Sequence, residues 1–205
     1  MMNTNMHGSR TMTGNTGNVG GRRGSRWRIA FWAAAALVLL LPLVAMQFSD
    51  EVNWSVADFA FAGALLLVVG VTYELATRMK VNTTYRLAVG VALAAAFLLV
   101  WLSLGAGIIG RDGDPANLMY FGVLAVGIIG ALIARFRPRG MALALLATAL
   151  AQMSVGVIAL VAGLGYPWSG PMELSALNGF FVALFVGSAW LFRRAAHGRP
   201  EQGAA

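Results

Sequence analysis

Long apolar segments separated by short polar stretches make up most of this chain. Six such segments cover residues 29–48, 56–77, 87–109, 118–136, 141–164 and 174–192. Each comes close to the about 20 residues that an α-helix needs to cross roughly 30 Å of hydrocarbon, and in lipid a helix satisfies its own backbone hydrogen bonds. Transmembrane strands would be shorter and would alternate in polarity, which these segments do not. The pattern predicts an all-α fold, a polytopic transmembrane helix bundle of six spans.

The charged residues between the segments predict how such a bundle is oriented. Of the 15 Lys and Arg residues, all except Arg111 fall before the first segment, between segments two and three, between four and five, or after six. The three other loops carry the acidic residues Asp50, Glu51, Asp112, Asp114 and Glu173. Short loops rich in Lys and Arg stay on the cytoplasmic side. Both termini are therefore predicted to be cytoplasmic.

Composition excludes several classes of function. Only 11% of the residues are charged, against about 25% in a typical soluble domain. The net charge of +7 is spread over four segments without a motif that reads nucleic acid, so it predicts no nucleic-acid partner and an attraction to anionic lipid at the cytoplasmic face. The chain has no cysteine, and its two histidines, His7 and His197, lie in the polar tails. No metal, haem or other cofactor site is therefore expected within the bilayer.

The same pattern divides the chain into three parts. Residues 1–26 are rich in Gly, Asn, Thr and Arg, which predicts a disordered basic cytoplasmic tail. Residues 27–193 form the six-helix transmembrane domain, and residues 194–205 form a short cytoplasmic tail. No soluble domain is expected at either end.

Local patterns predict where helices begin and how they pack. Ser55 and Asp58 have the spacing of a capping box, and Asp114 precedes a proline as a helix cap would. Small residues allow helix backbones to approach closely in lipid. The fifth segment carries such a face, with Ala144, Thr148, Gln152 and Gly156 at four-residue spacing, and the fourth carries Gly122, Gly127 and Gly130.

Polar residues within the segments are the candidate functional positions, because burying them in hydrocarbon is costly. Three stand out: Asp58, Gln152 and Asn178. Counted from the outer ends of their segments, Gln152 is about 12 residues (~18 Å) deep and Asn178 about 5 residues (~8 Å) deep. That difference predicts no direct hydrogen bond between them. It favours either two steps of a polar substrate path, with Asp58 at its outer mouth, or separate interhelical hydrogen bonds.

Catalysis finds little support in the remaining residues. The segments contain no histidine and no central aspartate, and the chain has no phosphate-binding Gly-x-x-x-x-Gly-Lys loop, so no catalytic residue is predicted. Aromatic residues near the segment ends are interpreted as interfacial belts that anchor the helices. They are Trp27, Trp54, Tyr85, Tyr120, Tyr166, Trp168 and Trp190.

Three stretches resemble a known group of proteins. Residues 51–59 (EVNWSVADF), 114–123 (DPANLMYFGV) and 135–140 (RFRPRG) are similar to segments of small multi-span inner-membrane proteins of Gram-negative bacteria, mainly alphaproteobacteria. The resemblance covers roughly residues 30–165 and leaves out the amino-terminal tail. It implies a multi-pass architecture and the bacterial inner (cytoplasmic) membrane, and it carries no activity or site residue.

Two classes of function remain. A structural or accessory subunit of a membrane assembly, with a membrane-protein partner or as a homo-oligomer, fits the scarcity of buried polar groups. A small transporter or channel would need a polar path through the bundle, for which Asp58, Gln152 and Asn178 are the candidates.

Overall fold

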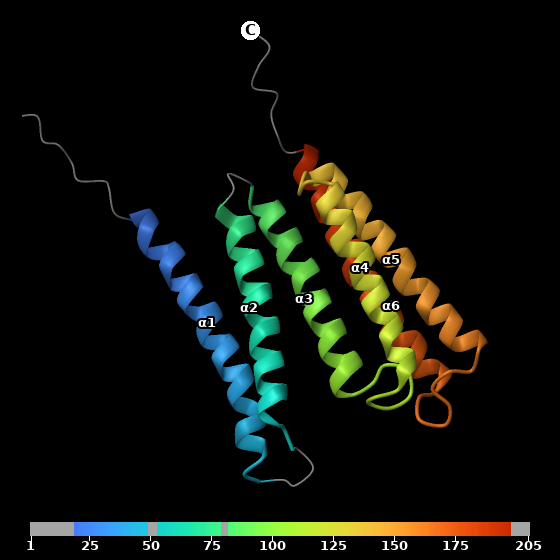
Figure 1. The fold of residues 1–205 in the computed structure, drawn as a ribbon. Coiled ribbons are helices and arrows are strands. Elements are labelled where there is room, and N and C mark those ends of the chain that lie inside the picture. The colour runs from blue at the N-terminus through green and yellow to red at the C-terminus, as the bar shows by residue number, and fades with distance from the viewer. Residues whose placement is uncertain (1–18, 49–52, 79–81, 198–205) are drawn as a thin grey trace, which may run out of the picture. The chain divides into compact units, whose positions relative to one another are not determined.

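Every regular element in the described part of the chain is a helix (Figure 1). A computed structural model describes residues 19–48, 53–78 and 82–197. The elements are α1 (Val19–Ala45), α2 (Val56–Arg78), α3 (Thr83–Gly105), the 3-10 helix η1 (Pro115–Leu118), α4 (Met119–Ile133), α5 (Pro138–Val161) and α6 (Pro171–His197). Five stretches, which fall in α2 to α6, are long and apolar enough to cross a membrane, whereas the apolar part of α1, Trp32–Ala45, is shorter. The all-helical prediction is confirmed.

The helices begin where polar residues cap them rather than where the apolar runs begin. Residues 87–109 were predicted as the third span, but α3 starts at Thr83 because the Asn82 side chain accepts a hydrogen bond of 2.9 Å from the Tyr85 amide. An N-cap of this kind satisfies one of the backbone N–H groups that the first turn leaves without a partner. The fourth, fifth and sixth predicted spans likewise start three residues late, because Pro115, Pro138 and Pro171 open the observed helices.

Helical structure extends into both predicted tails. Helix α1 begins at Val19, so residues 19–26 are helical, whereas residues 1–18 lie outside the described part of the chain. Helix α6 continues to His197 and includes part of the predicted carboxy-terminal tail. Extending an existing helix by a residue costs little once its nucleus has formed, and arginine is a good helix former.

The chain divides into two compact units, residues 1–60 and 61–205. The first contains α1 and the start of α2. The predicted capping box is present there, since the Asp58 carboxylate accepts from the Ser55 amide at 2.7 Å and the Ser55 hydroxyl accepts from the Asp58 amide at 3.3 Å. The Trp54 and Phe59 rings meet edge to face across this cap, with centroids 5.1 Å apart.

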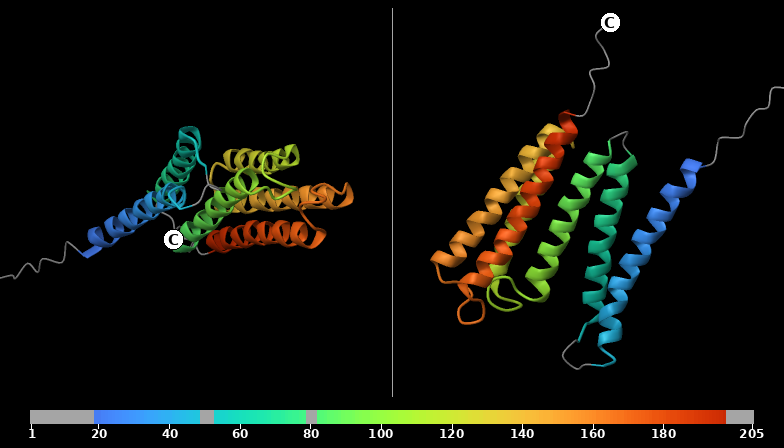
Figure 2. Two further views of the ribbon diagram at one scale, coloured as in Figure 1. Left: turned by 90° about the horizontal axis from the view of Figure 1, so that it is seen from below. Right: turned by 180° about the vertical axis from the view of Figure 1, so that it is seen from behind.

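The second unit holds most of the buried side chains. Helix α6 packs against α5 and α3, and α5 also packs against α4, while α3 and α4 touch much less (Figure 2). The chain neighbours α4–α5 and α5–α6 form antiparallel hairpins (Figure 1). Helix α3 instead packs chiefly on α6, where the Ser188 hydroxyl donates to the Ala88 carbonyl at 2.7 Å. The core includes Tyr85, Leu99, Tyr120, Phe181, Phe185 and Phe192.

The predicted small-residue face of α5 lies in these contacts. Ala144, Thr148, Gln152 and Gly156 are all buried. A Cβ atom added to Gly130 of α4 would lie 2.7 Å from the Ala144 Cβ and 3.2 Å from its Cα, and one on Gly127 would lie 3.1 Å from the Thr148 hydroxyl. The two helices therefore approach as closely as glycine permits.

Close approach at Gly130 predicts opposite effects of one substitution at two positions on α4. Gly130→Ala places a methyl group against the α5 backbone, so we expect the free energy of unfolding to fall by roughly 1–3 kcal/mol. Gly122→Ala is the matched control, because nothing lies within 4 Å of the added atom. Alanine is the better helix former by up to about 1 kcal/mol, so the control should be neutral or stabilising. Thermal unfolding in mild detergent measures both, and equal effects would contradict the packing.

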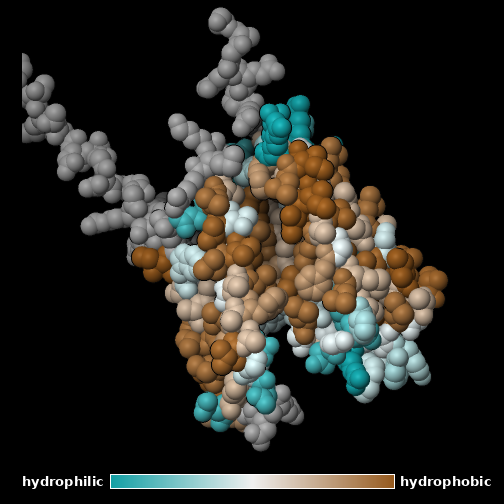
Figure 3. Space-filling view, viewed as in Figure 1, coloured by the Kyte–Doolittle hydropathy of each residue, from teal (hydrophilic) through white to brown (hydrophobic). Residues whose placement is uncertain are grey.

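The outer surface of the second unit is largely apolar along the helices. Over α4 and α5 it is hydrophobic in the middle and hydrophilic at both ends (Figure 3). Large apolar side chains such as Ile128, Leu132, Leu143, Leu150 and Val157 are more than half exposed. A soluble monomer rarely exposes so large an apolar surface. These helices fit an integral membrane protein.

Candidate functional site

Three buried polar side chains from α4, α5 and α6 meet inside the second unit. The Asn178 amide oxygen accepts hydrogen bonds from the Tyr120 hydroxyl at 3.2 Å and from Gln152 Nε2 at 3.0 Å. Asn178 Nδ2 donates to the Leu174 carbonyl one turn earlier on α6, at 2.9 Å. Gln152 and Tyr120 are 0% exposed and Asn178 is 5% exposed. Asn178 is therefore the centre of a polar cluster that links three helices.

The cluster lies where α5 and α6 are closest. A Cβ added to Gly156 would be only 2.9 Å from the Asn178 Cγ, so the glycine makes room for the asparagine. Among the buried side-chain atoms of the described residues, Gln152 Oε1 alone has no hydrogen-bond partner. A buried polar atom without a partner costs about 1–3 kcal/mol. Gln152 Oε1 is therefore the acceptor of this site that still lacks a donor.

The prediction that Gln152 and Asn178 are too far apart for a hydrogen bond was wrong. Helix α5 ends at Val161 and α6 begins at Pro171. Measured from those residues, Gln152 is nine residues from its helix end and Asn178 seven residues from its helix start. The depths thus differ by about 3 Å rather than about 10 Å, at 1.5 Å per residue. Loop residues 162–164 were counted as helix, which inflated the depth of Gln152, and helical residues 171–173 were left out, which reduced the depth of Asn178.

Two tyrosines assigned to the interfacial belt belong to the interior instead. Tyr120 is part of the polar cluster. Tyr85 is 1% exposed, and its hydroxyl donates to the Phe136 carbonyl at 2.8 Å while its ring meets Phe192 edge to face. Buried tyrosine hydroxyls usually find a partner. One feature of the sequence pointed to Tyr120, since it lies just after the cap at Asp114 on a helix of otherwise apolar residues.

Asp58 has a different role in the structure from Gln152 and Asn178. Its carboxylate accepts from both the amide and the hydroxyl of Ser55, each at 2.7 Å, and the residue is exposed. It belongs to the first compact unit, whereas the cluster belongs to the second. The capping explanation of Asp58 is thus confirmed, and its place at the mouth of a path stays a prediction.

The loop between α3 and α4 contains a second polar arrangement, which the sequence patterns did not indicate. Asn117 is 3% exposed, and its oxygen accepts from the amides of Ile108 and Ile109, both at 2.9 Å. Its nitrogen donates to the carbonyls of Ile109 at 3.0 Å and Arg111 at 3.2 Å. The Asn117 side chain thereby hydrogen-bonds four backbone groups of the loop after α3.

The loop after α5 is tied to the same region. The Ser169 hydroxyl donates to the Gly110 carbonyl at 3.1 Å and accepts from the Gly110 amide at 3.0 Å. Gly110 has a φ of +73°, which favours glycine. Asp114 caps η1 as predicted, with its oxygen 2.8 Å from the Ala116 amide. These contacts join the end of α3 to the beginnings of α4 and α6.

The chemistry available to the central cluster is that of neutral hydrogen-bonding groups. It consists of two amides and one phenol, without a carboxylate, thiol or imidazole. In residues 19–48, 53–78 and 82–197, no three His, Cys, Asp or Glu side chains gather as they would around a metal ion. The cluster can join helices or contact a polar solute.

Comparisons with known proteins add no relative to this picture. No family model matches the chain. Neither the curated proteins nor the solved structures include a significant match.

Proposed function

We propose that this chain is a multi-pass membrane protein with a structural or accessory role in a larger membrane assembly. The observation that carries the proposal is that the buried polar side chains form hydrogen bonds with one another or with the backbone. Ser103 and Thr148 donate to carbonyls of their own helices, Ser188 donates to α3, and the cluster around Asn178 satisfies itself except for one atom. Groups that serve a solute path would instead face a cavity with polar capacity to spare.

The alternative, a small transporter or channel, is supported by that one atom. Gln152 Oε1 would find a hydrogen-bond donor in water or in a passing polar solute. This reading makes Gln152 and Asn178 part of a path, with Asp58 at its outer end. The two proposals differ in whether water reaches the cluster.

Cysteine accessibility separates these two functions, and the chain has no native cysteine to interfere. We expect cysteines placed singly at Gln152 and Asn178 to resist a membrane-impermeant thiol reagent, because both side chains are buried. A cysteine at Gly113, which is exposed in an outer loop, is the positive control. Mass spectrometry of the labelled protein in vesicles measures the result. Labelling at both buried positions would reject the structural role and favour a water-filled path.

The proposal includes six spans with both termini in the cytoplasm of a Gram-negative bacterium. It is supported by the Lys and Arg asymmetry and by the stretches that resemble inner-membrane proteins. Helix α1 would supply the first span, although its apolar part, Trp32–Ala45, is shorter than the other candidate spans.

Reporter fusions test this topology. Alkaline phosphatase, which is active only in the periplasm, should be active when fused after Gly113 and inactive when fused after Arg137 or at the carboxyl terminus. The reverse pattern would overturn the orientation. A five-span arrangement would leave these fusions unchanged and put the amino terminus outside, so protease access to an amino-terminal tag completes the measurement.

A further inference from the structure

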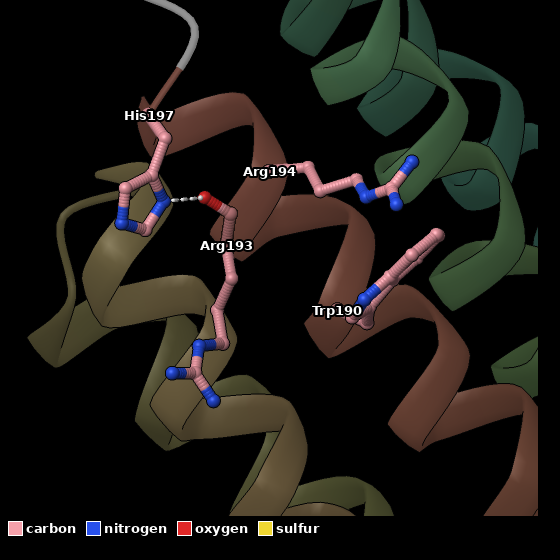
Figure 4. A pocket seen from close by; sticks show the side chains of 4 residues that line it. All are labelled: Trp190, Arg193, Arg194 and His197. Carbon is pink, nitrogen blue, oxygen red and sulfur yellow. Dashed lines mark hydrogen bonds between the residues drawn. The ribbon is translucent and has the colours of Figure 1, made fainter.

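The last two turns of α6 form an open basic pocket of about 670 Å³ (Figure 4). It is lined by Trp190, Arg193, Arg194 and His197, which share one helix face at spacings of three and four residues. The Arg194 guanidinium lies 3.7 Å from the centroid of the Trp190 ring, a cation–π contact that holds the arginine in place. The His197 Nδ1 donates to the Arg193 carbonyl at 2.7 Å, because a carbonyl oxygen can only accept. Its Nε2 is left for an external group.

Within residues 82–197 no acidic side chain lies at this end of the helices. Between residues 82 and 197 the acidic residues are Asp112, Asp114 and Glu173, and all three lie at the opposite end of the helices (Figure 1). The turn between α4 and α5 adds Arg135, Arg137 and Arg139 to the basic end. Arginine side chains bind phosphate oxygens through paired N–H groups. The pocket is therefore complementary to a phosphate.

The same face of α6 offers room for a hydrocarbon chain next to the pocket. Gly179, Ala183 and Gly187 follow one another at four-residue spacing and continue into Trp190 and Arg194. A Cβ added to Gly179 or Gly187 would meet no atom within 4 Å, and Ala183 is exposed. These three residues are here called the α6 track, and their large neighbours Phe180 and Val186 are 48% and 43% exposed.

We infer that the pocket binds the phosphate headgroup of an anionic phospholipid, with one acyl chain lying along the α6 track. The Arg194 guanidinium, which lies over the Trp190 ring, contacts the phosphate, and Arg193, whose side chain points the other way (Figure 4), adds positive charge beside it. The Trp190 ring lies at the level where headgroup and chain join. Tryptophan is typical of that level of the bilayer. This inference requires membrane insertion but is independent of the accessory role proposed above.

Two double variants with the same loss of charge test the headgroup contact. The full-length protein is placed in nanodiscs of phosphatidylcholine with increasing phosphatidylglycerol, and lipids that stay bound are counted by native mass spectrometry. Arg193→Gln/Arg194→Gln should weaken phosphatidylglycerol binding by roughly 30-fold or more, because it removes charge-assisted hydrogen bonds to the phosphate, which are stronger than general attraction to an anionic surface. Arg137→Gln/Arg139→Gln, at the same end of the helices, should change it less than roughly threefold. Equal losses would mean general electrostatic attraction and would overturn the site.

Filling the α6 track tests the acyl chain. Gly187→Leu should lower phosphatidylglycerol retention, whereas Gly122→Leu on α4 should not. Inorganic phosphate at millimolar concentration should fail to displace the lipid, since it lacks the chain. Full displacement by phosphate, with Gly187→Leu behaving like the parent protein, would mean that the pocket binds a free ion. If Gly187→Leu instead abolishes a dimer and leaves lipid binding intact, the track is the surface of a second copy. Either result overturns the proposal.

Discussion

We expect Asn117→Leu to destabilise the protein more than any other single substitution considered. The side chain makes four hydrogen bonds to the backbone of residues 108–111, and the amides of Ile108 and Ile109 are buried. Leucine matches the shape of asparagine but leaves both amides and the Ile109 carbonyl without a partner, whereas the Arg111 carbonyl keeps its bond from the Asp114 amide. Each buried unpaired group costs about 1–3 kcal/mol. Some of these groups can reach water at the outer end of the helices, so we expect a total loss of roughly 3–5 kcal/mol in the free energy of unfolding.

Two further substitutions separate the hydrogen bonds from packing. Asn117→Asp keeps the acceptor for both amides but turns a second oxygen toward two carbonyls, so its loss should be about half as large. Leu118→Ala changes the exposed neighbouring residue and should be nearly neutral. Thermal unfolding in mild detergent ranks the three. If Asn117→Leu unfolds like Leu118→Ala, the side chain does not organise the loop.

Asn117 also explains why the helix bounds could be predicted only approximately. Ile108 and Ile109 are 1% and 0% exposed, so hydropathy treats them as part of a span. They belong to a buried loop, where Gly107 and Gly110 adopt φ values of +75° and +73° that end the helix. Hydropathy reports burial and not helical geometry. The loop could have been identified only by asking which side chain satisfies its backbone.

Local chemistry was predicted well where it involves neighbours in sequence. The capping box at Ser55 and the cap at Asp114 are both present, because each depends on residues within three positions. Small-residue spacing marked Gly130 and Ala144 as positions of close approach, although not as partners of each other. Such patterns indicate which face of a helix packs against another helix.

Pairing between distant helices could not be predicted in the same way. Helix α3 is joined to α6 by the Ser188–Ala88 bond and by the Asn82 side chain, which donates to the Ala195 carbonyl at 3.2 Å. These partners are 100 and 113 residues apart. No periodicity within a single segment specifies which helix lies opposite. The cluster of Tyr120, Gln152 and Asn178 depends on the same long-range arrangement, which is why only two of its members were identified.

The second large effect concerns the two amides of the cluster. We expect substitution of Asn178 to lower the free energy of unfolding more than substitution of Gln152. Asn178→Leu removes the acceptor that Tyr120 and Gln152 share, so a buried phenol and a whole buried amide lose their partners. We expect a loss of roughly 2–4 kcal/mol in the free energy of unfolding. Gln152→Met removes an oxygen that already lacks a partner and leaves the Tyr120 bond in place. Its loss should be about 1 kcal/mol or less, since interhelical hydrogen bonds in lipid average about 0.6 kcal/mol.

The double variant distinguishes a shared dry cluster from two independent amides. With Gln152→Met already present, Asn178→Leu strands only the Tyr120 hydroxyl, so the double variant should be more stable than Asn178→Leu alone. Independent sites would give additive losses, which make the double variant the least stable of the three. Water at the cluster would also satisfy the stranded groups and shrink every difference. Unfolding midpoints of the parent and the three variants therefore test, in one double-mutant cycle, whether Asn178 joins the helices α4, α5 and α6 or lines a path through them.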